Sequence, residues 1–442
     1  MKYLNKRGYV IIKEHFNYEV LNDIREELTV RPFNSYIDPN NVESYQVFLE
    51  NEKKMYLPKI YGIEKFGEAE DKIPTSEDIN LRFNGEIREN QKTAIDASLK
   101  QLKETGGGIL VLPCGYGKTC IGLYLISQMK KKTLVICHKE FLVNQWKDRI
   151  ETFLPEARLG KIQGQKFDIE DKDIVIGMLQ SLSMKEYDLK AFDSFDFIIV
   201  DECHHISSKV FSRTLKKINC HYHIGLSATP VRADGLMKVL EWHFGKIYFS
   251  VSNKDDMKEK RNVKIKRVII ENHNLYSQEI LNFKKKPQIP SMITNIINYP
   301  ERNNKIIEIL FEVIKEKRNI LVLSDRRDHL VEISKLLKEK EFEDFGFYIG
   351  GMKEKDLKLS ENRQVIFGTY MMCSEGYDNK NLDTLIMATP KGNIEQSIGR
   401  VLRKDVYDIE PLVVDIVDNF SAFINQAKKR MTFYKKKGYI NK

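Results

Sequence analysis

The stretch that decides the fold is ILVLPCGYGKT, residues 109–119. It begins with an apolar run, continues through a turn that contains Gly115 and Gly117, and leads into a helix-like segment that starts near Lys118. A short run that is apolar on both faces is typical of a buried strand in a parallel sheet. The stretch therefore predicts a strand, a glycine-bearing turn and a helix in direct succession, which is the repeating unit of an α/β fold.

The turn between this strand and this helix has the composition of a phosphate-binding loop. Glycines let backbone N–H groups wrap a phosphate, and the helix N-terminus that follows attracts negative charge. Lys118 would supply a cation for the β- and γ-phosphates, and the hydroxyl of Thr119 is suited to Mg²⁺. The general pattern has glycine at the position of Leu112, which is a departure. A glycine-rich turn without chemistry is the less favoured alternative, because strand, GKT and helix coincide.

A second apolar run ends in a dense group of polar side chains, FIIVDECHH at 197–205. Cysteine, histidine and carboxylate side chains bind zinc, so a zinc site is one interpretation. Consecutive residues point in different directions, however, whereas zinc needs ligands that converge on a tetrahedron. A phosphate-loop enzyme requires a strand that ends in an acid holding Mg²⁺; Asp201 fits that role, with Glu202 beside it to polarise the attacking water. The sequence therefore favours nucleotide chemistry, with Thr119 and Asp201 as the Mg²⁺ residues.

Apolar runs alternate with amphipathic helical stretches along most of the chain. A first region contains TLVICH and DIVIGM, and a second contains NILVLSD, RQVIFGTY and PLVVDIV. This pattern predicts an α/β fold with two tandem parallel-sheet lobes, preceded by a small α+β N-terminal domain. The predicted boundaries are 1–85 for the N-terminal domain, 86–248 for the first lobe, 249–290 for a linker, 291–427 for the second lobe and 428–442 for a basic tail.

The composition is that of a soluble globular protein. The chain has 442 residues, of which 42% are hydrophobic and 31% charged, so several cores can be buried. It has no run of 18 apolar residues and no signal-peptide pattern, so we expect no membrane partner and a cytoplasmic location. The six cysteines are scattered, which indicates free thiols in a reducing compartment. A net charge of +9 favours a polyanionic partner.

Several further blocks follow in a fixed order and carry a resemblance to a known family. GYGKT, DECH and SATP resemble motifs I, II and III of superfamily 2 helicases, and QSIGRVLR at 396–403 resembles their motif VI. PCGYGKT and QSIGRVLR are most similar to the XPB-type group, whose general build phage and viral DNA helicases share. One departure is Ala233, in the place of the glutamate of that group's Arg-Glu-Asp element. The other blocks are similar to the adenine-recognition segment (IRENQ, 87–91), motif Ia (LVICHKEFLVNQW, 134–146), the strand-contact motif (GMLQSL, 177–182), motif IV (ILVLSDRRDHL, 320–330) and motif V (GTYMMCSEGYD, 368–378).

The resemblance implies that the two lobes are RecA-like and that ATP is hydrolysed. Arg400 and Arg403 would both reach the γ-phosphate, since residues three apart share a helix face. The catalytic residues that it implies are Lys118, Asp201, Glu202, Gln396, Arg400 and Arg403. The ATP-binding residues that it implies are Arg88, Gln91, Pro113, Gly115, Gly117, Lys118, Thr119, Gly376 and Asp378. The nucleic-acid-binding residues that it implies are Gln180, Ser181, Arg232, Arg326 and Thr369.

The function that the resemblance implies is an ATP- and Mg²⁺-dependent DNA helicase or translocase. It would act as a monomer on forked, branched or single-stranded DNA, in branch migration, recombination or repair, and move 3′ to 5′. An RNA helicase or a viral transcript-release factor is the alternative, and a nucleic-acid clamp with an inactive site is disfavoured by the intact ATP motifs. The N-terminal domain is interpreted either as a DNA-binding or as a packing domain. The basic stretch 428–439 is interpreted either as a single-strand contact or as a solvated helix.

Overall fold

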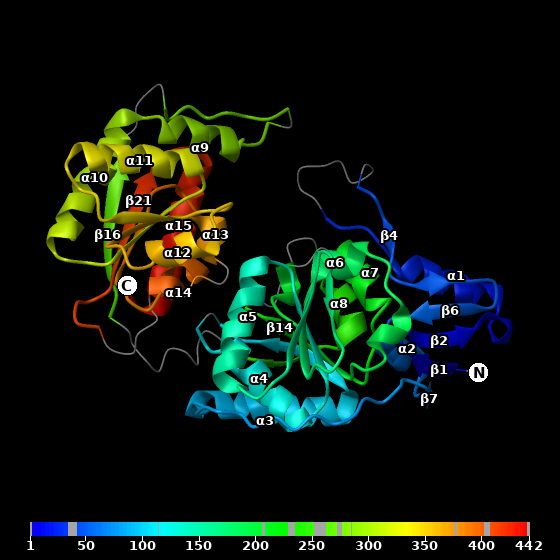
Figure 1. Ribbon diagram of the computed structural model, residues 1–442. Coiled ribbons are helices and arrows are strands. Elements are labelled where there is room, and N and C mark those ends of the chain that lie inside the picture. The colour runs from blue at the N-terminus through cyan, green and yellow to red at the C-terminus, as the bar shows by residue number, and fades with distance from the viewer. Residues whose placement is uncertain are drawn as a thin grey trace. The chain divides into compact units, whose positions relative to one another are not determined.

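The computed structural model describes residues 2–33, 42–113, 115–205, 208–228, 235–251, 262–271, 276–283, 285–374, 377, 379–401 and 407–439. The chain divides into two compact units, Met1–Lys254 and Asp255–Lys442. Each unit contains a large sheet of mainly parallel strands with helices on both faces (Figure 1). The prediction of two tandem RecA-like lobes with a small α+β domain is confirmed.

The main sheet of the first unit has eight strands in the order β11-β10-β12-β9-β13-β14-β8-β15. All of its pairings are parallel except that between β10 and β11. The strands are β8 (Gly107–Val111), β9 (Thr133–Cys137), β10 (Leu159–Gln163), β11 (Lys166–Asp168), β12 (Ile174–Met178), β13 (Phe197–Val200), β14 (Tyr222–Ser227) and β15 (Ile247–Ser250). The helices are α3 (Glu89–Thr105), α4 (Lys118–Met129), α5 (Glu140–Phe153), α6 (Leu179–Met184), α7 (Ser208–Leu215) and α8 (Met237–Phe244).

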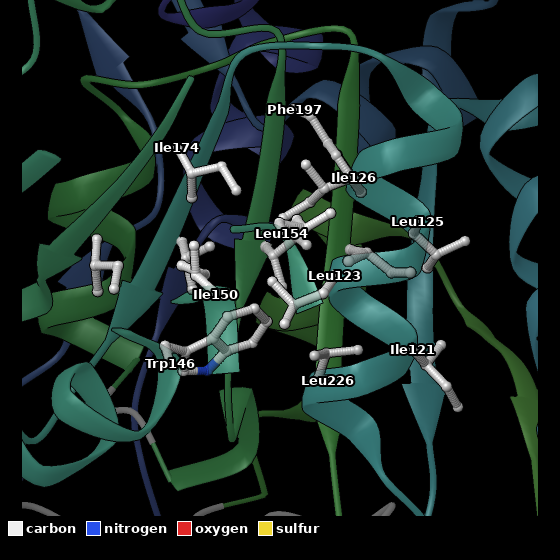
Figure 2. Close-up of a cluster of buried hydrophobic side chains, with 14 of the residues drawn as sticks. Ile121, Leu123, Leu125, Ile126, Trp146, Ile150, Leu154, Ile174, Phe197 and Leu226 are labelled. Carbon is white, nitrogen blue, oxygen red and sulfur yellow. The ribbon is translucent and has the colours of Figure 1, made fainter. Parts of the chain in front are cut away.

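Alternate residues of these strands enter two different cores. Helices α3, α4 and α5 pack on one face of the sheet, where Leu123, Trp146 and Leu226 meet (Figure 2). Helices α6, α7 and α8 contribute to the core on the other face, with residues such as Leu182 and Phe244. Both faces are covered, which explains why the strands are apolar along their whole length rather than alternating with polar residues.

The N-terminal module, residues 2–71, forms a five-stranded sheet in the order β5-β6-β2-β1-β7. Its core continues into the first lobe, because Val239 and Trp242 of α8 are buried together with Tyr61. The module therefore packs on the lobe, and DNA binding by it stays a prediction. Its elements are β1 (Lys2–Asn5), β2 (Gly8–Ile12), α1 (Tyr18–Glu27), β3 (Thr29–Val30), β4 (Tyr45–Gln46), β5 (Leu49–Glu50), β6 (Lys54–Leu57), α2 (Lys59–Phe66) and β7 (Glu70–Asp71).

The second unit has a six-stranded, fully parallel sheet in the order β16-β21-β20-β17-β19-β18. Helices α10 and α11 contribute to the core on one face, and α13, α14 and α15 to the core on the other. The strands are β16 (Lys264–Ile270), β17 (Ile320–Ser324), β18 (Phe345–Tyr348), β19 (Val365–Thr369), β20 (Thr384–Met387) and β21 (Leu412–Asp418). The helices are α9 (Ile289–Ile297), α10 (Pro300–Lys315), α11 (Arg327–Glu339), α12 (Glu354–Ser360), α13 (Tyr370–Ser374), α14 (Glu395–Val401) and α15 (Ser421–Lys437).

Two segments of the second unit differ from the predicted division of the chain. Residues 264–270, expected in the linker, form β16 and pair with β21 along their whole length. β16 is an edge strand, and edge strands often have charged side chains exposed to solvent. This Lys-rich composition hid the apolar pattern by which a strand is recognised in the sequence. Residues 428–437, expected in the basic tail, continue α15, where Tyr434 is fully buried. Most of this stretch is therefore a packed helix.

Candidate functional site

The phosphate loop joins the end of β8 to the start of α4. Gly115 and Gly117 have φ angles of +85° and +90°, which glycine adopts without steric cost. A Cβ at Gly117 would lie 2.4 Å from the Nε2 atom of Gln91. Helix α4 begins at Lys118, so its N-terminal N–H groups and the loop backbone surround the same point. This geometry suits a phosphate group.

Lys118 and Glu202 meet at this loop, although 84 positions separate them in the chain. The Lys118 Nζ atom lies 2.9 Å from the Glu202 Oε1 atom, and their side chains are only 11% and 14% exposed. The pairing follows from the sheet order, in which β14 alone separates β13 from β8, so the carboxyl ends of both strands lie at one edge. Glu202 has a φ angle of +47°, and its Oε2 atom accepts a 3.3 Å hydrogen bond from the backbone N–H of Ala228.

Asp201 is buried beside this pair and is fixed through both of its oxygens. The indole Nε1 atom of Trp146 donates to Oδ2 at 2.9 Å, and the backbone N–H of Glu202 donates to Oδ1 at 3.0 Å. Burial, followed by the nearby charge of Glu202, raises the pKa of Asp201 to about 6. Because burial disfavours the charged form of this carboxylate, a bound cation would stabilise that form.

The donor set at this edge fits Mg²⁺. Oxygen ligands are those that Mg²⁺ prefers, and it usually takes one or two carboxylates together with phosphate oxygens. The carboxylate of Asp201 and the hydroxyl of Thr119, in the first turn of α4, would supply oxygen ligands from one edge of the sheet.

The described side chains of residues 201–204 contact several different partners, and Glu202 and His204 also contact each other. The Nδ1 atom of His204 lies 2.8 Å from the hydroxyl of Ser227, and Cys203 is buried in the core beneath the sheet. Asp201 contacts Trp146, and Glu202 contacts Lys118 and also the Nδ1 atom of His204, at 3.4 Å. Within the parts of the chain that the structure describes, no group of three or more His, Cys, Asp or Glu side chains is arranged to hold a metal.

Gln91, expected to contact adenine, ties the first helix of the lobe to the phosphate loop. Its Oε1 atom accepts from the backbone N–H of Arg88 at 3.1 Å, and its Nε2 atom donates to the carbonyl of Tyr116 at 2.8 Å. The carbonyl of Pro113 accepts from the N–H of Tyr116 at 3.3 Å. The adenine contact stays a prediction. The structure shows in addition that Gln91 is hydrogen-bonded to the phosphate loop at Tyr116.

The candidates for nucleic-acid contact lie at the carboxyl ends of strands within each unit. In the first unit, Gln180 and Ser181 directly follow β12; the Gln180 Nε2 atom donates to the carbonyl of His138 at 2.8 Å. In the second unit, Thr369 ends β19 and Arg326 directly precedes α11, which follows the neighbouring strand β17. This placement is the edge of a parallel sheet where ligands bind in such folds.

Comparison with known proteins identifies the family. Residues 84–232 match the family described as the res subunit of type III restriction enzymes. A protein of Acanthamoeba polyphaga mimivirus, L396, provisionally named an ATP-dependent RNA helicase, is 35% identical over 449 residues, which covers 99% of this chain and 85% of the viral protein. The chain belongs to the superfamily 2 helicases.

This helicase is also similar to proteins of other viruses and of a phage. Protein 161L of Invertebrate iridescent virus 6, provisionally named a helicase, is 26% identical and covers 82% of this chain and 84% of its own. D10 of Escherichia phage T5, provisionally named a helicase, is 26% identical over 74% of this chain and 71% of its own. The crystal structure of T4 UvsW is 20% identical, covers 95% of this chain and 94% of its own, and has a TM-score of 0.38. The prediction of an ATP-dependent helicase is confirmed.

Several predicted site residues of the helicase lie where the structure gives no description. Helix α14 contains Gln396 and Arg400, one turn apart, but only their backbone is described. The residues outside the described ranges are Arg232, Gly376, Asp378 and Arg403. Over the described ranges, no helix of this helicase combines the length and the apolarity that crossing a membrane requires.

Trp146 is a residue of the candidate site that the sequence motifs did not indicate. It ends the motif Ia block, and its ring is fully buried in the core of α4, α5 and the sheet (Figure 2). The signal available in the sequence was chemical: a buried indole N–H requires an acceptor. That acceptor is Asp201, so the segment that resembles motif Ia is hydrogen-bonded directly to the candidate Mg²⁺ residue.

Substituting Trp146 with phenylalanine is expected to weaken Mg²⁺ use. The Asp201 oxygen would lose its indole donor, and loss of such a supporting bond typically costs 10–100-fold in metal affinity. We expect the Mg²⁺ concentration for half-maximal ATPase activity, and that for binding a fluorescent ATP analogue, each to rise about tenfold. Trp242→Phe, the same change at the other tryptophan, is the control. Equal Mg²⁺ requirements in both variants would contradict the role of Trp146.

Proposed function

We propose that this helicase is an ATP-driven translocase that unwinds or remodels forked or branched DNA. The observation that carries the hydrolytic half of the proposal is the convergence of Lys118, Asp201 and Glu202 on the phosphate loop. DNA as the substrate is supported by the motifs PCGYGKT and QSIGRVLR, which resemble those of XPB-type DNA helicases. Movement from 3′ to 5′, a monomeric state, an intracellular location and a role in branch migration, recombination or repair rest on the same resemblance.

The ion pair between Lys118 and Glu202 suggests how ATP prepares the site. The triphosphate of ATP would compete with the Glu202 carboxylate for the Lys118 ammonium, since both are anions at the same cation. Glu202, released from Lys118, would then accept a proton from the attacking water. Thr119 and Asp201 would hold Mg²⁺, which neutralises charge on the phosphates when bound. In this scheme the carboxylate is kept from acting until nucleotide arrives.

The remaining roles rest on sequence motifs. Gln396, Arg400 and Arg403 are proposed to sense and stabilise the γ-phosphate, and Gly376 and Asp378 to link nucleotide to nucleic acid. Gln180, Ser181, Arg232, Arg326 and Thr369 are proposed to contact the strand backbone, which a motor indifferent to sequence requires.

An RNA-directed activity is the second candidate. It is favoured by the names of two relatives: mimivirus L396 and African swine fever virus QP509L, the latter 28% identical over 77% of this chain, are both provisionally named ATP-dependent RNA helicases. The same ATP site and the same backbone contacts would serve either substrate.

Stimulation of ATPase activity separates these two functions. At one fixed salt concentration we expect a DNA four-way junction to stimulate steady-state hydrolysis several-fold more than RNA of matched sequence and nucleotide content. The salt must be fixed because backbone contacts make binding to either nucleic acid strongly salt-dependent. Single-stranded DNA of the same composition is the control for simple strand binding. Stronger stimulation by the RNA would assign the helicase to the transcript-handling alternative.

A further inference from the structure

The segment between β16 and α9 ends in a short β-hairpin, residues 280–288. Leu281 and Pro287 face each other in antiparallel register, and the backbone N–H of Gln288 donates to the carbonyl of Ile280 at 2.6 Å. In Figure 1 this segment extends away from the sheet of the second unit. The turn of the hairpin therefore projects from the body of the unit.

The turn of the hairpin places Phe283 at its tip. The N–H of Asn282 donates to the carbonyl of Lys286 at 2.9 Å, and the N–H of Lys285 donates to the carbonyl of Asn282 at 2.9 Å. The side chain of Asn282 also accepts from the N–H of Lys286, at 3.0 Å. Lys285 has a φ angle of +55°, and a residue with this left-handed backbone closes the common three-residue hairpin loop. The turn is thus held by its own bonds, while the side chain of Phe283 is 86% exposed.

The base of the hairpin is fixed to the second unit. Ile280 packs on the small core between α9 and α15, and the carboxylate of Glu279, just before it, accepts a 2.5 Å hydrogen bond from the hydroxyl of Ser421. At the other end, the Nη2 atom of Arg326 donates to the carbonyl of Pro290 at 3.1 Å. Arg326 directly follows β17 at the carboxyl edge of the sheet and is a candidate for nucleic-acid contact. The hairpin is therefore anchored beside that candidate.

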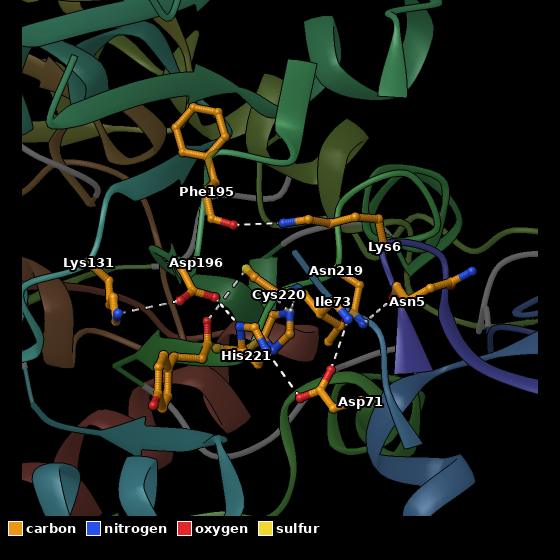
Figure 3. Close-up of polar contacts among 12 residues, drawn as sticks. Asn5, Lys6, Asp71, Ile73, Lys131, Phe195, Asp196, Asn219, Cys220 and His221 are labelled. Atoms are coloured by element: carbon orange, nitrogen blue, oxygen red, sulfur yellow. Dashed lines mark hydrogen bonds and ion pairs between the residues drawn. The ribbon is translucent and has the colours of Figure 1, made fainter. Parts of the chain in front are cut away.

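The turn also carries two cations, Lys285 and Lys286. Both are exposed, and over the described ranges neither forms an ion pair with a carboxylate. Basic groups elsewhere in the chain are often engaged by acids, as where the N-terminal module packs on the first lobe and His221 contacts both Asp71 and Asp196 (Figure 3). An exposed aromatic ring and positive charge thus lie together on one turn of the second unit.

We propose that this hairpin binds a single strand of nucleic acid, with the ring of Phe283 stacked on a base and the ammonium groups of Lys285 and Lys286 at phosphates. Every base has a face on which an aromatic ring can stack, so such a contact accepts any sequence, as a translocating motor requires. Lysine side chains beside the ring supply the charge that follows the strand backbone. The contact extends the interface proposed for Arg326 and depends on the proposed nucleic-acid function.

The length of the hairpin allows one strand to reach both places. Pro290, whose carbonyl bonds Arg326, follows Phe283 by seven positions in the chain. At roughly 3.3 Å for each residue, the tip lies at most about 23 Å from Pro290. A strand of about seven nucleotides spans this distance even at the spacing of roughly 3.4 Å that phosphates have along a duplex. Such a strand can therefore contact Arg326 and stack on Phe283 at the same time.

The test measures the affinity of the full chain for oligothymidylate DNA and for oligouridylate RNA of equal length, at one fixed salt concentration. On the strand that the chain prefers, we expect Phe283→Ala to bind about tenfold more weakly, because the stacking of one base on an aromatic ring has about this effect. Phe283→Trp keeps a ring and should bind as the unmodified chain does. The loss should vanish on an abasic strand of the same length, which has phosphates but no bases. Leu359→Ala is the matched control, because Leu359 is a 58% exposed apolar residue of α12 in the same unit.

A second arm tests the two lysines. The slope of log affinity against log salt is measured, to which each phosphate contact on a single strand contributes about 0.7. A chain that carries both Lys285→Gln and Lys286→Gln should lose about 1.4 from this slope, whereas Phe283→Ala should keep it. The matched control carries Lys315→Gln and Lys317→Gln, two exposed lysines that precede β17 and so lie at the amino edge of the sheet, opposite the proposed contact.

The proposal is wrong if Phe283→Ala binds like Leu359→Ala, if its loss persists on the abasic strand, or if the double lysine variant keeps the slope of its control. Self-association of the chain that Phe283→Ala abolishes, with strand binding unchanged, would assign the hairpin to a second copy of the chain instead. The unmodified chain tests the proposed function separately. Stronger binding to RNA would change the substrate but leave the hairpin contact in place, whereas binding to neither strand would overturn both.

Discussion

Replacing Glu202 with glutamine is expected to lower kcat for ATP hydrolysis at least about 100-fold, since a positioned general base contributes typically 10²–10⁴ in rate. The variant keeps the size of the side chain and its contact with the N–H of Ala228, so the loop should retain its shape. It removes the charge that pairs with Lys118 at 2.9 Å, which frees the ammonium for the triphosphate. ATP binding is therefore expected to stay as tight or to become tighter.

Two measurements separate this effect from a structural one. Steady-state hydrolysis is compared with equilibrium binding of a fluorescent ATP analogue, and Glu156→Gln, an exposed glutamate of the same lobe, serves as the control. Hydrolysis at the unmodified rate would remove Glu202 from the catalytic role. Loss of binding together with hydrolysis would show instead that Glu202 supports the architecture of the loop.

The local order of the site was predictable because it depends on short-range rules. An apolar strand followed by Gly115, Gly117 and Lys118 has few folds available to it, and a second strand ending in Asp201 extends the same rule. That Lys118 contacts Glu202 rather than Asp201 was not predictable, because it depends on the φ angle of +47° at Glu202 and on the order β13-β14-β8. The bond from Trp146 to Asp201 is likewise a tertiary contact between residues 55 positions apart.

The sequence was misleading where charged residues lie in packed elements, because their contacts with distant residues make that position stable. The charged residues of β16 are acceptable only because the strand lies at an edge and pairs with the buried β21. In α15, the buried Arg430 pairs with Asp415 at 2.8 Å, a contact that turns part of a basic stretch into core. Lys59 is buried, and its ammonium donates to two carbonyls that no local pattern in the sequence indicates. Each of these partners is remote in sequence and has no local signal.

Substituting Trp242 with alanine is expected to lower the free energy of unfolding of the first unit by about 3–5 kcal/mol, the usual cost of truncating a buried aromatic residue. Trp242 is 9% exposed, and its ring meets the ring of Tyr61 edge-on, with 5.7 Å between centroids. Since Tyr61 belongs to the N-terminal module and Trp242 to the lobe, the cavity would remove packing contacts between the module and the lobe. The measurement is chemical denaturation followed by circular dichroism, with Tyr18→Ala, 76% exposed in the same module, as the control expected to change stability by less than about 0.5 kcal/mol.

The same packing between module and lobe determines the expected effect of deleting the N-terminal module. Deleting residues 1–80 would expose Leu236, Val239 and Trp242, which are buried against the module. It would also remove Lys59, whose ammonium donates to the carbonyls of Cys220 and His221. We therefore expect the truncated chain to lose soluble expression, ATPase activity and nucleic-acid binding together, because exposed apolar surface of this kind favours aggregation. A truncated chain that hydrolyses ATP normally but no longer binds forked DNA would contradict this expectation and would make the module a separable DNA-binding domain.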